Sequence, residues 1–345
     1  MDCLSGLTKT LWFVAMSSLV YQQSFGGSFA LTSGADSGPF ERSRVGSAVD
    51  ATLSLKFGQG GLLLMGGGAD VDAAFATRVV NHIGPDADVV VLRTKGSDAY
   101  NKYLLPLMQA NSVETVIIDT REKANSPLLS DILNHAEFIW IAGGDQSEYI
   151  RTWMHTDLQK SIRRAYQRGA VIGGTSAGMA ILSPIIYNPD GVPGVLSSEA
   201  LADYCHESVR FSYDFVKYLL PTFIGDTHFG RRDRFGRLVN FIEHHALLHP
   251  LGIGIDEATS LFINSWGHGV VDGRGNVYIL SMSSRNWFQS RCGGPTFASK
   301  VKRTLLKATD SYNLWTGKNT GRTTFVDVNG GESPPYQPTD PYAQE

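Results

Sequence analysis

The sequence predicts an α/β protein built around a mostly parallel β-sheet with helices on both faces. Three observations support this fold class. Short, almost continuous apolar runs recur from residue 61 onward, as expected of strands that are buried on both faces. Each run is followed by a segment long enough for a helix, which is the pattern of βαβ units. A hydrophobic share of 42% over 345 residues is that of a globular chain with a large core.

The predicted strands lie at residues 62–65, 88–92, 113–118 and 137–142, and a fifth, at 170–172, ends in a glycine-rich turn. The predicted helices lie at residues 70–81, 98–110, a stretch ending near 135, and 147–153. In parallel sheets of this kind, ligands bind beyond the carboxyl ends of the strands. Gly66-Gly67-Gly68 follows the first of these ends and predicts a tight turn below a cleft. Residues 269–280 predict a β-hairpin at the sheet edge.

Composition divides the chain into four parts. Residues 1–30 place Lys9 before an apolar run and end in a small-residue site at Ala30, which is the layout of a secretory signal. Residues 31–55, rich in serine and glycine, predict a linker, and residues 56–320 predict a single α/β catalytic domain. Residues 321–345 carry several prolines among polar residues and predict a disordered tail. We therefore expect a secreted or periplasmic protein.

The cysteines bear on whether the protein is exported. Of the three, Cys3 would be removed with the signal, and Cys205 and Cys292 would remain. In an oxidising compartment these two form a disulfide or stay as buried free thiols, and the sequence leaves both possibilities open.

The charge balance limits the range of partners. With 30 basic and 33 acidic residues, the chain has no bulk attraction to nucleic acid or to an anionic membrane. The apolar run at residues 11–20 is too short to span a bilayer. His244, His245 and His249 do not predict a metal site, because neighbouring residues on a helix point apart. We expect no nucleic acid, membrane, metal or cofactor.

The turn at residues 173–178 has the pattern Gly-x-Ser-x-Gly between a strand and a helix. In that context the glycines permit a sharp bend that lifts Ser176 into a cleft at the start of a helix, as in a nucleophile elbow. A plain strand-to-helix turn is the alternative. The N–H groups of Ala177 and of Gly144, which follows the neighbouring strand, are candidate donors to an oxyanion.

A histidine and a carboxylate complete the predicted machinery. Alternation along the extended segment puts Asp226 and His228 on one face, just before a predicted helix. In a chain that also carries a serine elbow, His228 is a candidate general base rather than a structural histidine. Glu257, at the end of another short strand, is the candidate that orients the histidine, in preference to Asp256.

Further polar residues near these motifs are candidates for substrate binding. Arg232, Arg234 and Arg237 follow the histidine, and their guanidinium groups suit substrate carboxylates. A solvated helix surface is the alternative for these arginines. Gln146 follows the fourth strand and can both donate and accept hydrogen bonds.

Together these segments resemble cyanophycinase, of the peptidase S51 group that also includes the aspartyl dipeptidases. The order serine, histidine, acid differs from that of α/β-hydrolases, in which the acid precedes the histidine. The resemblance extends from about residue 61 to residue 280 and rests on four segments in one order: Gly143-Gly144-Asp145-Gln146, residues 173–178, Asp226-x-His228-Phe229 with Arg232, Arg234, Gly236 and Arg237, and residues 252–257.

The resemblance implies a flavodoxin-like, class I glutamine amidotransferase-like fold and a serine exopeptidase that is commonly dimeric. It implies cleavage of β-aspartyl bonds of cyanophycin, a polyaspartate that carries arginine on its side-chain carboxylates, with release of β-Asp-Arg dipeptides. Ser176 would be the nucleophile, His228 its base and Glu257 the orienting acid. The residues that would line the substrate pocket are Gln146, Asp226, Thr227, Arg232, Arg234 and Arg237.

One departure from the pattern bears on the substrate. Thr227 stands between the aspartate and the histidine, where cyanophycinase commonly has glutamine. An aspartyl or isoaspartyl dipeptidase acting on short peptides is the alternative that keeps this chemistry. A non-catalytic binding protein on the same scaffold is the alternative from another class.

Overall fold

The computed structural model describes residues 39–218, 220–282 and 290–344. The predicted secretory signal at residues 1–30 and the first part of the predicted linker lie outside these residues. Within the described ranges, no helix is both long and apolar enough to cross a membrane.

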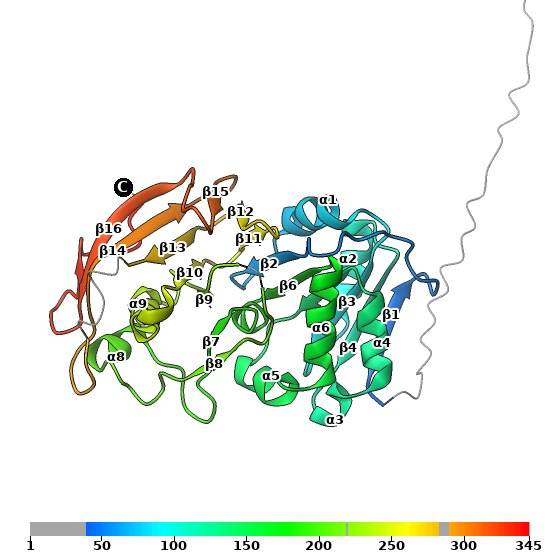
Figure 1. Cartoon of the computed structure of the whole chain (residues 1–345), viewed down its shortest axis with the longest axis horizontal. Helices are drawn as coiled ribbons and strands as arrows, with labels where there is room; N and C mark the ends of the chain where they lie inside the picture. Colours follow the sequence, from blue (N-terminus) through cyan, green and yellow to red (C-terminus); the bar gives the residue numbers. More distant parts are fainter. Residues whose placement is uncertain (1–38, 219, 283–289, 345) are drawn as a thin grey trace, which may run out of the picture. The chain divides into compact units, whose positions relative to one another are not determined.

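The core of the first sheet is a set of parallel strands (Figure 1). They adjoin in the order β4-β3-β5-β6-β2. When the strands are numbered along the chain from β3, β4-β3-β5-β6 lie in the order 2-1-3-4, as in a flavodoxin-like sheet. Strand β2 takes the place of the fifth strand. The predicted fold class is therefore confirmed for this part of the chain. The bounds are β2 (Gly61–Met65), β3 (Asp88–Arg93), β4 (Ser112–Ile117), β5 (Phe138–Ile141) and β6 (Val171–Thr175).

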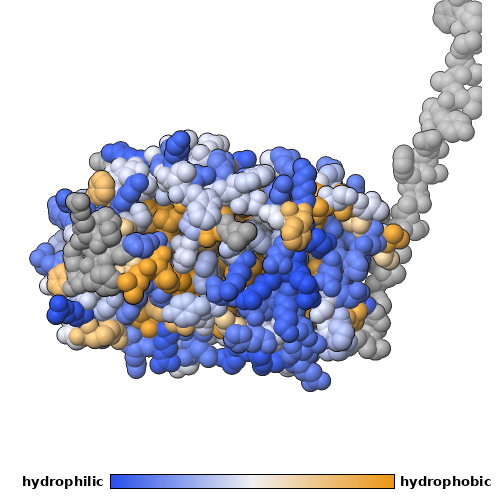
Figure 2. Space-filling view, viewed as in Figure 1, coloured by the Kyte–Doolittle hydropathy of each residue, from blue (hydrophilic) through white to orange (hydrophobic). Residues whose placement is uncertain are grey.

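Helices cover both faces of this sheet. Because successive side chains of a strand point to opposite faces, Leu62 and Leu64 join one core with α4 and α6, while Leu63 and Met65 join another with η1 and α2. Hydrophilic residues lie over the outer side of α6 (Figure 2). The helices are η1 (Ala74–Val79), α1 (Val80–Ile83), α2 (Ala99–Met108), α3 (Arg121–Ala124), α4 (Pro127–His135), α5 (Gln146–Trp153), α6 (Asp157–Arg168), α7 (Ala177–Ala180), α8 (Ser197–Ala202), α9 (Phe235–His244) and η2 (Ala246–Leu248).

A second, largely antiparallel sheet lies beside the first and was not predicted (Figure 1). Its order is β17-β16-β14-β13-β10-β9-β7-β8, and β9 runs parallel to both β10 and β7. Strands β9 and β10 matter for the site, because His228 and Glu257 follow them. The bounds are β7 (Ile185–Tyr187), β8 (Phe211–Tyr213), β9 (Phe223–Asp226), β10 (Leu251–Ile255), β13 (Val277–Ser281), β14 (Phe297–Leu306), β16 (Arg322–Asn329) and β17 (Tyr336–Gln337).

The hairpin predicted at residues 269–280 is wrong. Strand β12 (His268–Gly273) pairs with β11 (Thr259–Ile263) and β15 (Ser311–Asn313) in the first sheet, whereas β13 pairs with β10 and β14 in the second. The turn between β12 and β13 therefore carries the chain from one sheet to the other. The Asp256 carboxylate accepts hydrogen bonds from the amides of Asn276 and Gly230 and so holds this crossing.

The predicted tail and linker also need correction. Residues 322–329 form β16, where Val326 and Val328 are buried, and Tyr336 of β17 is buried as well. The prolines that suggested disorder lie outside these strands. Within the predicted linker, β1 (Arg42–Gly46) forms the edge of the first sheet by pairing with β4, and its arginines lie beside Glu114. The folded α/β domain therefore extends beyond the predicted residues 56–320 at both ends.

Cys205 and Cys292 form a disulfide between the segment after α8 and the segment before β14. Replacing both cysteines by serine is expected to lower the free energy of unfolding by about 2–4 kcal/mol, because the cross-link restricts the unfolded chain. Urea unfolding of the two proteins measures the difference. A reductant should bring the wild type to the stability of the double variant and leave that variant unchanged, and equal stabilities without reductant would contradict the expectation.

Candidate active site

Ser176 lies at a sharp turn between β6 and α7. Its backbone has φ 52° and ψ −118°, an uncommon conformation for a residue with a side chain. The amide of Ser176 donates to the carbonyl of Met65 at 3.1 Å, which ties the turn to β2. A Cβ on Gly178 would lie 2.1 Å from the carbonyl oxygen of Ile141, so glycine is required for this close approach. The turn has the geometry that a nucleophile elbow needs.

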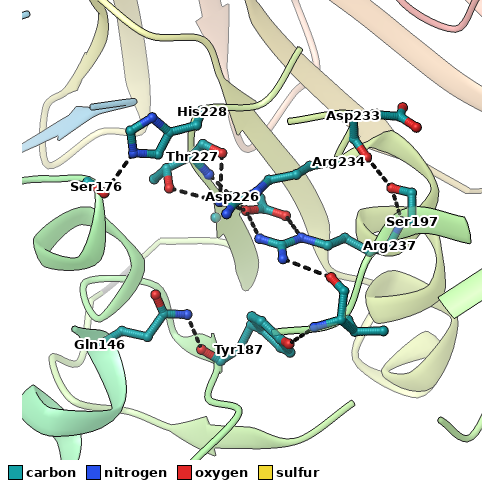
Figure 3. Close-up of polar contacts among 12 residues, drawn as sticks. Gln146, Ser176, Tyr187, Ser197, Asp226, Thr227, His228, Asp233, Arg234 and Arg237 are labelled. Carbon is teal, nitrogen blue, oxygen red and sulfur yellow. Dashed lines mark hydrogen bonds and ion pairs between the residues drawn. The ribbon is translucent and has the colours of Figure 1, made fainter. Parts of the chain in front are cut away.

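His228 lies beside this serine, and the two side chains point toward each other (Figure 3). Ser176 Oγ is 2.8 Å from His228 Nε2, and His228 Nδ1 is 2.6 Å from Glu257 Oε1. A carboxylate only accepts hydrogen bonds, so Nδ1 carries the proton and Nε2 is free to accept from the serine. The structure thus joins three side chains that are far apart in the sequence.

The glycine turn at residues 66–68 holds these elements together. His228 N donates to Gly66 O at 2.8 Å, and Ala258 N donates to Gly67 O at 2.9 Å. A Cβ on Gly67 would lie 2.5 Å from the imidazole of His228. The end of β2 therefore fixes the position of the histidine, which goes beyond the tight turn that the sequence predicts.

Burial and neighbouring charges set the ionisation states of His228 and Glu257. Burial, with a contribution from Arg232 and Arg234, lowers the pKa of His228 below its ordinary value of 6.5, although Glu257 acts in the opposite direction. The hydrogen bonds from His228 and Arg231 lower the pKa of Glu257. Arg231 Nη1 lies 2.6 Å from Glu257 Oε2. At neutral pH the imidazole is therefore uncharged and the carboxylate ionised, as a general base and its orienting acid require.

These shifts predict a pH dependence. Because protonated His228 cannot accept a proton, kcat/KM should fall as the pH drops through the His228 pKa, with its midpoint below about 6.5. Arg232→Gln removes a positive charge that lowers this pKa, so the midpoint should rise. Lys318→Gln, which removes an exposed charge elsewhere, serves as the control. A midpoint that stays in place in Arg232→Gln, or moves down, would contradict the assignment.

Gly144 and Ala177 border the nucleophile. A Cβ on Gly143 would lie 3.6 Å from Ser176 Cβ, which places the turn at residues 143–144 against the serine. Tyr149 Oη donates to the carbonyls of Ala142 and Gly143 at 3.0 and 3.2 Å and so fixes this turn. Ala177 is the first residue of α7, where N–H groups lack an intrahelical acceptor. Gly144 and Ala177 therefore remain the candidate oxyanion donors. The supporting role of Tyr149 was missed because a buried tyrosine on a helix has no sequence signature.

The residues around Asp226 form a buried ion cluster (Figure 3). Arg237 contacts Asp226 through Nε and Nη2 at 2.7 and 2.6 Å, and Arg234 Nη1 lies 3.1 Å away. Burial acts to raise the pKa of Asp226, but the two arginines outweigh it and hold that pKa below its ordinary value. Arg234 also donates to Thr227 O. Asp226 is thereby committed to positioning the arginines.

A polar cavity of about 460 Å³ is lined partly by the predicted binding residues. Gln146, Arg234 and Arg237 line it, whereas Asp226 and Thr227 are buried behind it and Arg232 is exposed outside it. The sequence therefore assigned six residues to a pocket that three of them line. The remaining lining residues are Asp145, Ser147, Arg151, Tyr187 and residues 189–194.

Residues 184–220 predict an excursion over the cleft, and Tyr187 and residues 189–194, which line the cavity, lie within that range. The range is not all loop, because β7 within it is a buried strand. Gln146 Nε2 donates to Tyr187 O at 2.9 Å and connects α5 to this strand (Figure 3). In the described part of the chain, there is no group of His, Cys, Asp and Glu side chains suited to hold a metal ion.

Comparison with known proteins decides the family. The sequence profile of peptidase family S51 matches residues 85–268. The chain belongs to peptidase family S51. The resemblance inferred from the motifs is thereby confirmed, and this S51 chain is cyanophycinase-like.

Two cyanophycinases agree with that result. A cyanophycinase from Synechococcus elongatus is 30% identical over 210 residues, which cover 59% of this chain and 61% of that protein. One from Nostoc sp. is 30% identical over 212 residues, covering 60% and 67%. A solved peptidase structure from an acI-B1 Actinobacterium aligns with a TM-score of 0.47 and 19% identity over 76% of this chain and 97% of that one. The S51 chain thus spans about three fifths of the length of the first of these relatives.

Proposed function

We propose that this S51 chain is a serine exopeptidase that acts on cyanophycin and releases β-Asp-Arg dipeptides. The observation that carries the proposal is the hydrogen-bonded series Ser176, His228 and Glu257, with 2.8 and 2.6 Å between successive partners. Similarity to cyanophycinases supports the choice of substrate. The charged cavity lined by Gln146, Arg234 and Arg237 supports a substrate that carries both carboxylate and cationic groups.

The proposed reaction passes through an acyl-enzyme. His228 takes the proton of Ser176 while its oxygen attacks an aspartyl carbonyl, and Glu257 stabilises the imidazolium that forms. The N–H groups of Gly144 and Ala177 bind the oxyanion. His228 then gives its proton to the leaving amine. A water molecule, deprotonated by His228, attacks the acyl group and restores Ser176.

The product determines which bond is broken. A released β-Asp-Arg dipeptide keeps the β-linkage between aspartate and arginine, so hydrolysis must occur at the backbone bond between neighbouring aspartyl residues. Cleavage of the β-aspartyl bond itself, which the resemblance suggests, would release free arginine instead. We therefore propose attack on the backbone carbonyl, with the β-linked arginine carried along as a side chain.

Product analysis by mass spectrometry tests this function. The purified protein is incubated with cyanophycin, with α-Asp dipeptides and with β-Asp dipeptides, beside a Ser176→Ala control. The expected product from cyanophycin is β-Asp-Arg. Free arginine as the first product would refute the backbone cleavage, and turnover of dipeptides alone would favour the aspartyl dipeptidase. Absence of any turnover, together with no labelling by serine-directed acylating reagents, would favour a non-catalytic binding protein.

We also propose that the protein is exported and acts as a homodimer. The Cys205–Cys292 disulfide supports an oxidising compartment. N-terminal sequencing of protein recovered outside the cytoplasm tests for cleavage near Ala30, and recovery of the uncleaved chain inside the cell would refute export. Light scattering after size-exclusion chromatography tests for the dimer, which a mass no greater than the 37.6 kDa of one full chain would refute.

A further inference from the structure

The cavity that Gln146, Arg234 and Arg237 line also holds an ion pair between two of its lining residues. Arg151, from the last turn of α5, places Nη1 2.7 Å from Asp190 Oδ1 in the loop after β7. Both residues line the cavity. Their side chains are 60% and 46% exposed, and ion pairs this exposed contribute little to stability. A guanidinium from another molecule can therefore replace Arg151 on this carboxylate at small cost.

Asp190 is the lining carboxylate that caps no helix, and among the described residues its side chain makes polar contact only with Arg151. Asp145 caps α5 by accepting from the amides of Ser147 and Glu148. Asp226 lies behind the cavity and is committed to Arg237 and Arg234. Asp190 Oδ2 accepts no hydrogen bond from the described residues. A guanidinium that contacts both oxygens would complete the site, since a carboxylate binds a guanidinium best through two parallel hydrogen bonds.

The backbone around Asp190 is held in place. Arg210 Nη1 donates to the carbonyl of Asp190 at 3.0 Å. At the far end of the loop, Val195 N donates to Tyr187 Oη at 2.7 Å, and Arg237 Nη1 donates to Val195 O at 3.1 Å. The carboxylate is therefore presented from an anchored loop, and little conformational freedom is lost when it binds a ligand.

We propose that Asp190 binds the guanidinium of an arginyl side chain in the substrate, and that Arg151 occupies this position in the free protein. The inference rests on the proposed function and adds to it the residue that selects arginine. The observation that supports it is that Arg151 already places a guanidinium on this carboxylate within the cavity lining.

Kinetics with matched substrates test the proposal. Two synthetic oligomers of the polymer repeat are compared, one with arginine and one with citrulline, which has nearly the same shape without the charge. The wild type should have a KM for the arginine oligomer about 10-fold below that for the citrulline oligomer. Asp190→Asn should raise the KM for the arginine oligomer to the citrulline value and leave kcat within about twofold, because the site acts in binding rather than chemistry.

Three further variants make the test specific. Asp157→Asn removes a carboxylate on α6 that is also 46% exposed and ion-paired, so it should leave both KM values unchanged. Asp190→Glu retains the charge and should retain a preference for arginine. Arg151→Gln frees Asp190, so the KM for the arginine oligomer should stay the same or fall. A rise in that KM would mean that Arg151 itself binds substrate, and would overturn its role as a substitute.

The outcomes separate this inference from the proposed function. If the wild type hydrolyses neither oligomer, the proposed function fails. If it hydrolyses both with equal KM, or if Asp190→Asn keeps the preference for arginine, the inference about Asp190 is wrong while the proposed hydrolysis stands. Equal losses with both oligomers in Asp190→Asn, with a lowered Tm, would assign the residue a structural role.

Discussion

Replacing Ser176 by alanine is expected to lower kcat by about 10⁴-fold or more, with KM little changed. The serine oxygen is the proposed nucleophile, and its loss leaves only the oxyanion donors and substrate binding to accelerate hydrolysis. Alanine keeps the Cβ, so the unusual φ of 52° at this position costs the same in both proteins. The fold and the cavity should therefore be retained.

Measurement of β-Asp-Arg release by mass spectrometry, with equal thermal unfolding of the two proteins, checks this result. Ser130→Ala on α4, which removes a hydroxyl away from the cavity, is the matched control and should keep full activity. Activity of Ser176→Ala within about tenfold of the wild type would exclude an acyl-enzyme on this serine.

Replacing Gly67 by alanine is expected to lower kcat by about 10²-fold or more. The added Cβ would lie 2.5 Å from Cε1 and Nε2 of His228, far inside van der Waals contact. The imidazole must move away, and a displacement of about 1 Å at a catalytic group costs about this factor. The substitution also strains the backbone, since Gly67 has φ 95°.

Gly58→Ala is the control that separates the steric clash with His228 from the backbone strain. Gly58 has φ 77°, but a Cβ there meets no atom within 4 Å, and it lies before the amino end of β2, away from the site. Both variants should lose stability in urea unfolding, while only Gly67→Ala should lose kcat. Equal kcat in the two variants would show that the glycine turn does not position His228.

The parallel sheet was predictable because its strands are buried on both faces. Leu62, Leu63, Leu64 and Met65 are all inaccessible to solvent, and such strands must be continuously apolar whatever lies around them. The elbow was predictable from the Gly-x-Ser-x-Gly motif between a strand and a helix, although the close approach that requires Gly178 is to the carbonyl of Ile141 on the neighbouring strand. Local sequence therefore contained enough to select the nucleophile.

The second sheet and the ends of the domain were not predictable in this way. Strand β16 is buried on one face only, and its apolar residues are few, with Val326 and Val328 turned inward. Strand β1 is polar and is held at an edge by pairing with β4. In both cases the pairing partner is distant in the chain, so composition alone suggested a linker and a tail.

The candidate binding residues were also only partly predictable from the sequence. Arg232, Arg234 and Arg237 look equivalent in the sequence, yet the first is exposed outside the cavity, and the other two are oriented by the buried Asp226. Arg151 and Asp190 had no pattern to mark them, because they come from separate elements that meet only across the cavity.

The sequence by itself therefore determined the family, the parallel α/β core and the residue types of the proposed chemistry, since these depend on local bending, burial on both faces and short motifs. Only the tertiary structure decided which side chains meet. The contacts of His228 with Ser176, of Glu257 with His228 and of Arg151 with Asp190 join segments from different strands and helices. Such contacts depend on how whole elements pack, and no local pattern records that.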